Sequence, residues 1–212
     1  MIKETFVRVK EVLDRYYETR EEVIKLVREL LGYSREIVQY VHQKQFDRAI
    51  ALVDKAYRVV KQVNNIGRIE PRVRYSGLWL DTSKEYAEAV IFLNILKAIL
   101  GNTEVQVPFP EDLGISEEAW ILGLCEVAGE LKREILLAAR ENNFALARRI
   151  LLIIDEIYSC VSSLSYPSAI IPGIKSKVDY VRAILVSSEE LIFRLEKEHE
   201  LLEKMDKMLK KE

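Results

Sequence analysis

Two glutamates occupy positions where the apolar stripe of a helix should run, in the segment DTSKEYAEAVIFLNILKAIL. Glu85 and Glu88 lie three residues apart, and the same helical face continues at steps of four, three and four through Phe92, Ile95 and Ile99. A partly buried pair of carboxylates is costly unless a positive charge neutralises it. The pattern therefore predicts either a basic partner, for which only Lys84 lies close by, or a bound cation.

A third acid, Asp155, stands within an apolar run in the segment ALARRILLIIDEIYSCVSSL. Because isoleucines precede and follow it, we expect its carboxylate to be embedded in apolar surroundings. It could be a core acid that is hydrogen-bonded to Tyr158 or Ser159, or it could join the same cation site. Carboxylate oxygens from two helices suit a hard cation such as Mg²⁺ or Mn²⁺.

A further acid, Glu126, lies in the segment LGLCEVAGELKRE. It is a candidate for the same acidic site, and whether it joins that site stays open. Gly123 and Gly129 lie nearby, and each costs about 1 kcal/mol in a helix interior, which indicates a close approach to another helix. No histidine is placed to act as a general base, which disfavours imidazole-based ribonuclease chemistry.

The elements that must position these acids are helices. Gly and Pro cluster at a few junctions, and the long intervals between them are rich in Leu, Ile, Glu, Lys, Arg and Ala. We therefore expect one all-α domain over residues 1–212, a bundle of about six to seven helices. The predicted helices are approximately 2–43, 46–63, one that starts between 74 and 82 and ends at 100, 117–142, 145–164 and a last helix from 172 with a Lys-rich end over 186–212; residues 103–114 are predicted to be an irregular connection.

Positive charge is concentrated in the N-terminal third of the chain. Residues 1–75 contain sixteen Lys or Arg and eleven Asp or Glu, whereas the remainder contains sixteen and twenty-three. Candidate phosphate contacts are three cations on the polar side of the first helix and two in the linker after the second, namely Lys25, Arg28, Arg35, Arg72 and Arg74. A solvated face paired with nearby glutamates explains the three cations of the first helix equally well. For Arg72 and Arg74 a solvated loop is the default expectation.

Composition excludes several classes of protein. No window of eighteen consecutive apolar residues occurs, and the start MIKETFVRVK lacks the apolar core of a signal peptide, so we expect a soluble cytoplasmic protein with no membrane partner. Cys125 and Cys160 lie in apolar runs without metal-type spacing, and both are predicted to be buried. Glycine-rich phosphate loops and Ser/His/Asp sets do not occur.

Three segments resemble the translin and Trax family, and in particular the Trax branch. They are residues 85–90 (EYAEAV), residues 126–133 (EVAGELKR) and Asp155 in its helix. Trax proteins carry two glutamates three residues apart in the first context, where translins do not. Two positions depart from the family pattern: Glu156-Ile157 follow Asp155 in place of Gly-Phe, and Glu126 stands where Asp is common.

The resemblance implies a seven-helix all-α fold, a hollow oligomer that is an octamer in the family, RNA on its inner surface and metal-dependent endoribonuclease activity. By resemblance, Glu85, Glu88 and Asp155 form the catalytic and metal-binding set. We therefore expect a Mg²⁺-dependent (or Mn²⁺-dependent) endoribonuclease that acts on single-stranded or duplex RNA as a homo-oligomer. The alternatives are a non-catalytic translin-like RNA- or DNA-binding oligomer, a ferritin-like metal protein and a helical scaffold without ligands. The ferritin-like alternative is disfavoured because this sequence lacks the Glu-x-x-His motifs that such metal sites use.

Overall fold

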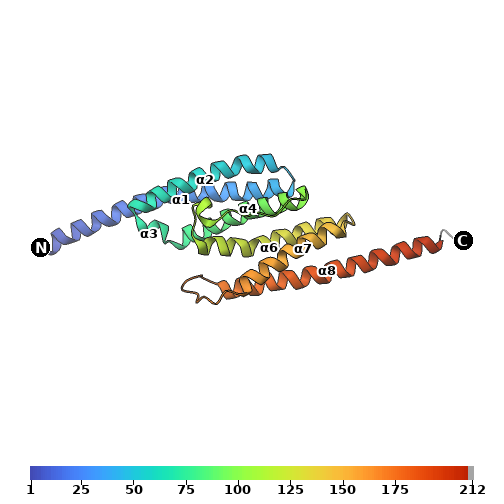
Figure 1. The fold of residues 1–212 in the computed structure, drawn as a ribbon. Helices are drawn as coiled ribbons and strands as arrows, with labels where there is room; N and C mark the ends of the chain where they lie inside the picture. The colour runs from blue at the N-terminus through green and yellow to red at the C-terminus, as the bar shows by residue number, and fades with distance from the viewer. Residues whose placement is uncertain (210–212) are drawn as a thin grey trace. The chain divides into compact units, whose positions relative to one another are not determined.

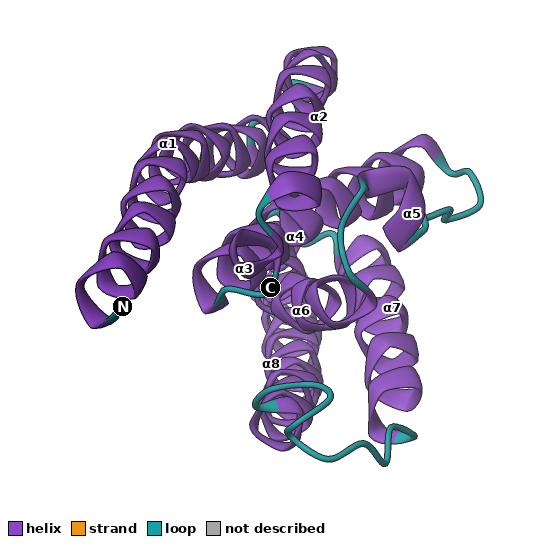
Figure 2. Ribbon diagram, turned by 90° about the vertical axis from the view of Figure 1, so that its left-hand side faces the viewer, coloured by secondary structure: helices purple, strands orange, loops and turns teal. Residues whose placement is uncertain are grey.

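A computed structural model of the chain describes residues 1–209, with side chains at all of these positions except 206 and 209. Within the described residues the chain forms eight helices, joined by loops and turns without any strand (Figure 2). The predicted all-α class is therefore confirmed. Residues 210–212, the end of the predicted last helix, lie outside the described residues.

Six of the helices are long and two are single turns. None of the helices within residues 1–209 is long and apolar enough to cross a membrane. The helices are α1 (Ile2–His42), α2 (Phe46–Ile69), α3 (Pro71–Arg74), α4 (Gly77–Gly101), α5 (Pro110–Leu113), α6 (Glu117–Arg140), α7 (Phe144–Ser162) and α8 (Ile174–Leu209).

The chain divides into two compact units. One unit consists of Met1–Leu93 and Val107–Gly123, and the other of Asn94–Gln106 and Leu124–Glu212. Helices α4 and α6 each contribute residues to both units. The assignment of a single domain to residues 1–212 stays a prediction.

In the first unit, α1 and α2 run side by side in opposite directions (Figure 1). Their contact is made by amphipathic faces, because the buried residues of each helix recur at steps of three and four. In α1 these are Val23, Val27, Leu30, Ser34, Ile37 and Val41, and in α2 they are Ala49, Leu52, Ala56, Val59, Val60, Val63 and Gly67. The end of α1 also reaches α4, where the rings of His42 and Phe92 lie 5.0 Å apart.

Helix α2 is longer than predicted. The expected stop after Val63 is wrong, because the side-chain amide of Asn64 does not cap the helix but donates a hydrogen bond of 2.7 Å to the carbonyl oxygen of Gly114. Glu70, which precedes a proline, adopts φ −124° and ψ 85° and ends the helix, since a residue before proline is disfavoured in the α region.

Two other predicted boundaries need correction. The connection over residues 103–114 is not wholly irregular, because it contains α5, which starts at Pro110 and ends at Gly114 in the left-handed conformation (φ 69°). Pro172 does not lie in the first turn of the last helix. Gly173 follows it with φ 73°, and α8 begins one residue later.

In the second unit, α7 and α8 pack together (Figure 1). The buried side of α7 is formed by Ala147, Ile150, Ile154, Ile157 and Val161. On the exposed side, the guanidinium of Arg148 donates hydrogen bonds of 2.7 and 2.5 Å to the two carboxylate oxygens of Glu196 on α8. Arg149 donates a hydrogen bond of 2.8 Å to the carbonyl oxygen of Ile99 near the end of α4, where a cation also suits the helix dipole.

The Arg148–Glu196 pair predicts a pH-dependent contribution to stability. The hydrogen-bonded guanidinium holds the pKa of the Glu196 carboxyl below its ordinary value. A depressed carboxyl pKa stabilises the folded state above the ordinary carboxyl range, and this contribution is lost as the pH falls through the folded pKa. We expect Arg148→Met to lower the melting temperature by a few degrees at pH 7 and by less at pH 3, measured by circular dichroism.

The matched control is Arg182→Met, which removes an exposed arginine of α8. This variant should show the same small change at both pH values. If Arg148→Met lowered the melting temperature equally at pH 7 and pH 3, the packing of the aliphatic part of Arg148 would matter, and not its charge.

Candidate functional site

Helix α4 is buried on almost every side, and its two predicted site acids are half-buried. The predicted stripe of Phe92, Ile95 and Ile99 is fully packed, which confirms that part of the sequence prediction. The side chain of Glu85 is 43% exposed. The helix therefore presents Glu85 and Glu88 at the partly solvated end of an otherwise apolar element.

Lys84 is the basic partner that the sequence offered for this pair. Its Nζ lies 3.6 Å from Oε1 of Glu85, and its own side chain is only 17% exposed. That separation satisfies an ion pair but is longer than a charge-assisted hydrogen bond of about 2.8 Å. Lys84 therefore lowers the electrostatic cost of holding Glu85 partly buried without occupying its carboxylate by a short contact.

The second turn of α6 lies directly against the turn of α4 that carries these acids. A Cβ atom at Gly123 would lie 2.7 Å from Cβ of Ala87, 2.8 Å from the carbonyl oxygen of Lys84 and 2.9 Å from the amide nitrogen of Glu88. None of these atoms is the end of a flexible side chain, so only glycine fits. The close approach predicted from Gly123 is confirmed, and it fixes the backbone beneath the carboxylate pair.

Glu126 has a basic partner in the second unit. The Nζ of Lys177 on α8 donates a hydrogen bond to its carboxylate and lies 5.5 Å from the centre of the Tyr180 ring. The hydroxyl of Tyr180 occupies the space that a Cβ atom at Gly129 would need. Sequence reasoning missed Lys177, because it is 51 residues away in the chain and no local pattern links it to Glu126.

Asp155 lies on the exposed side of α7, so the prediction that it is embedded in apolar surroundings is wrong. Ile154 and Ile157 beside it are buried. Successive helical residues point about 100° apart, so neighbours in sequence need not share a face. The predicted catalytic role of Asp155 stays a prediction.

The two cysteines differ in their surroundings. Cys125 is buried, as predicted, and burial raises the pKa of its thiol to about 11. Cys160 is exposed, so its predicted burial is wrong; like Asp155, it projects from the outer side of α7.

Within residues 1–209, no three side chains among His, Cys, Asp and Glu lie close enough together to hold a metal ion. Glu85 and Glu88 share one turn of α4 in the first unit, whereas Asp155 belongs to the second unit. The predicted metal site at Glu85, Glu88 and Asp155 stays a prediction.

The candidate phosphate contacts fall into two groups. Lys25, Arg28 and Arg35 are exposed on α1, as is Arg74 at the end of α3. Arg72, in contrast, is committed to local contacts. Its guanidinium donates two hydrogen bonds of 2.6 Å to the carboxylate of Glu70 and lies 4.0 Å from the centre of the Tyr16 ring.

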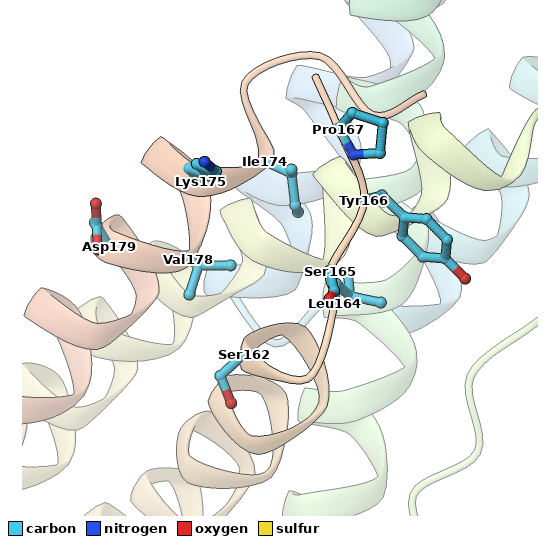
Figure 3. Close-up of a pocket in the computed structure, with 9 residues that line it drawn as sticks. All are labelled: Ser162, Leu164, Ser165, Tyr166, Pro167, Ile174, Lys175, Val178 and Asp179. Atoms are coloured by element: carbon cyan, nitrogen blue, oxygen red, sulfur yellow. The ribbon is translucent and has the colours of Figure 1, made fainter. Parts of the chain in front are cut away.

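One surface pocket in the second unit has a volume of about 650 Å³ and none of the predicted site residues in its lining. Figure 3 shows Lys175 and Asp179 projecting from α8, and Tyr166 and Pro167 on the loop that leads to it. The lining thus carries one cation and one anion, which does not select a ligand of either charge.

Comparison with known protein families identifies the family of this chain. A family model described as the Translin family matches residues 18–196. An uncharacterized protein of Methanocaldococcus jannaschii, MJ0175, is 26% identical over 167 residues, which cover 78% of this chain and 71% of that protein.

Solved structures show the same fold. The crystal structure of AfC3PO and the structure of an AfC3PO–duplex RNA complex each give a TM-score of 0.77 at 23% identity, and the match covers 89% of this chain and 95% of the other. The crystal structure of apo-NeC3PO gives a TM-score of 0.75 at 18% identity with the same coverage. The all-α fold of these proteins is therefore the fold of this chain.

The contact at Gly123 can be tested by a single added methyl group. We expect Gly123→Ala to lower the free energy of unfolding by about 1–3 kcal/mol, because the added Cβ meets backbone atoms that cannot move aside. The measurement is urea unfolding followed by circular dichroism.

The matched control is Gly32→Ala within α1, where no atom lies within 4 Å of the added Cβ. This variant should be more stable than the wild type by up to about 1 kcal/mol, through helix propensity alone. If both variants gained stability equally, α6 would not be pressed against the turn of Glu85 and Glu88.

Proposed function

The chain belongs to the translin family, and from that premise we propose that it is a Trax-like, metal-dependent endoribonuclease that binds RNA as a homo-oligomer. The observation that carries the proposal is the half-buried pair Glu85 and Glu88, held on an apolar helix whose backbone is fixed by Gly123. Two carboxylates at one half-buried turn create a local concentration of negative charge, which favours a positively charged ligand beside them.

The proposed metal ligands are Glu85, Glu88 and Asp155, and the proposed ion is Mg²⁺ or Mn²⁺. Their oxygen donors fit such a hard cation, which keeps several waters and uses few carboxylates. When bound, the cation would lower the pKa of a coordinated water and stabilise negative charge on the scissile phosphate. The positive charge of Lys84 partly offsets the negative charge of Glu85. The close contact at Gly123 fixes the backbone of the turn that carries both glutamates.

RNA is the proposed substrate. A structural neighbour of the same fold, AfC3PO, has been solved with duplex RNA, and the exposed Lys25, Arg28 and Arg35 lie along one helix of this chain. Cations spaced along a helix can contact successive phosphates without reading sequence. Arg72 is the weakest of the proposed contacts, because its guanidinium is already bonded to Glu70.

If Glu85, Glu88 and Asp155 are catalytic, their substitution should reduce RNA cleavage without reducing RNA binding. We expect Glu85→Gln, Glu88→Gln and Asp155→Asn each to reduce cleavage of a labelled RNA by about 100-fold or more, since each removes a group that stabilises charge at the reacting phosphate. RNA affinity, measured by fluorescence anisotropy, should change little.

The matched control is Glu156→Gln, which neutralises the exposed acid next to Asp155. It should cleave RNA at the wild-type rate. Undiminished cleavage in all three site variants would overturn the assignment of the catalytic residues.

The second candidate is a non-catalytic nucleic-acid-binding oligomer. One observation favours it: the exposed cations of α1 can bind phosphate without help from any carboxylate. Calorimetric titration with Mn²⁺ separates the two candidates.

A nuclease should bind Mn²⁺ saturably, and the double variant Glu85→Gln/Glu88→Gln should lose that binding while its melting temperature stays close to that of the wild type. Equal binding by the wild type and the double variant, together with tight RNA binding and no cleavage, would favour the second candidate.

A further inference from the structure

The N-terminal part of α1 carries an apolar stripe that is exposed to solvent. Its members are between 52% and 87% exposed. They recur at steps of four, three, four and four, and are Ile2, Phe6, Val9, Leu13 and Tyr17. Steps of this kind place all five on one side of the helix, so the stripe is a continuous surface and not a set of scattered exposed residues.

The exposed stripe continues the buried face of the same helix. From Leu13, steps of three, four and three lead through Tyr16 and Arg20 to Val23, the first of the residues that are buried towards α2. One seven-residue repeat thus runs through α1 from end to end, as in helices that pack along their whole length. Only the second half of this repeat meets a partner within the chain.

The reason is the difference in length between the two helices. Helix α1 has 41 residues and α2 has 24, so the first 14 residues of α1, roughly 21 Å at 1.5 Å per residue, extend past the end of α2 (Figure 1). Arg72, which stacks on Tyr16, marks the edge of the covered part. We call residues 2–15 the overhang.

The charge of the overhang indicates what kind of partner it fits. Residues 2–15 contain four Lys or Arg and three Asp or Glu, and Nζ of Lys10 lies 2.7 Å from the carboxylate of Asp14. A helix that docks on anionic lipid or on nucleic acid has a strongly basic polar face. A nearly neutral, mixed-charge helix with a seven-residue apolar repeat instead fits another helix of the same character.

We propose that the overhang pairs with the overhang of a second copy of this chain, in antiparallel orientation. This inference rests on the self-association within the proposed function and assigns a surface to it. In the antiparallel arrangement Ile2 lies opposite Leu13 of the second copy, and Phe6 lies opposite Val9. Every layer of the contact is then apolar, and the two copies use the same surface, as a twofold axis requires.

The orientation follows from the position of α2. In a parallel pair, the C-terminal ends of both α2 helices would lie at the same end of the overhang and would compete for the space beside the stripe just past Tyr16. In an antiparallel pair, the two α1–α2 hairpins lie at opposite ends of the contact. The antiparallel pair therefore covers both stripes without a clash.

The first test is the particle mass in solution, measured by light scattering. The double variant Phe6→Glu/Leu13→Glu should at least halve the mass of the wild-type particle, while its helical circular dichroism stays unchanged because both residues are exposed. The matched control, Arg8→Gln/Arg15→Gln, makes the same change of net charge on the opposite face of α1 and should leave the mass unchanged.

The measured masses show whether a negative result contradicts only the proposed contact or also the proposed self-association. A monomeric wild type would overturn both this inference and the self-association in the proposed function. An oligomeric wild type whose mass is unchanged in Phe6→Glu/Leu13→Glu would overturn this inference alone. If that variant kept its mass but lost RNA binding, the stripe would be a nucleic-acid contact and the inference would also be wrong.

The second test is disulfide cross-linking in a Cys160→Ser background, with the buried Cys125 left in place. Co-expressed Phe6→Cys and Val9→Cys chains should form a mixed disulfide dimer on mild oxidation, whereas Phe6→Cys with Glu11→Cys, which points to the other side, should not. If each single stripe variant cross-linked efficiently to itself and the mixed pair did not, the helices would be parallel and the proposed orientation would be overturned.

Discussion

The burial of α4 on almost every side is the constraint on which the candidate site depends. A helix in this position has no fully solvated face, and Glu85 and Glu88 lie at the turn where the packing leaves it half-exposed. The neighbouring Lys84 and the backbone of α6 meet the same turn. The positions of the two carboxylates are therefore set by packing that extends well beyond the acids themselves.

Local ion pairs divide the acids of the chain into two kinds. Glu70, Glu126 and Glu196 each accept a short hydrogen bond from an arginine or a lysine, which occupies the carboxylate. Glu85 has its lysine at 3.6 Å, a distance that offsets charge without occupying the oxygen atoms. The longer contact of Glu85 differs from these short ion pairs, in which the cation donates directly to a carboxylate oxygen.

Most of the fold could be predicted from local patterns, whereas the partners of individual side chains could not. Helical periodicity located all six long helices, and Gly123 signalled a close helix contact. The burial of Asp155 was predicted wrongly because its isoleucine neighbours in sequence point to another side of α7. The end of α2 and the lysine beside Glu126 were missed because the contacts of Asn64 and Lys177 span 50 and 51 residues. Such contacts depend on tertiary packing and leave no local signal.

The contact at Gly123 also has a consequence for how this chain could change over evolutionary time. A Cβ atom at position 123 would meet the backbone of Lys84 and Glu88 as well as Cβ of Ala87, so glycine is required there, and a larger residue at position 87 would press on the same glycine. Ala87 therefore has room to become glycine but not to grow. In related chains position 123 should therefore stay glycine, and position 87 should stay alanine or glycine, wherever the glutamates of α4 are retained.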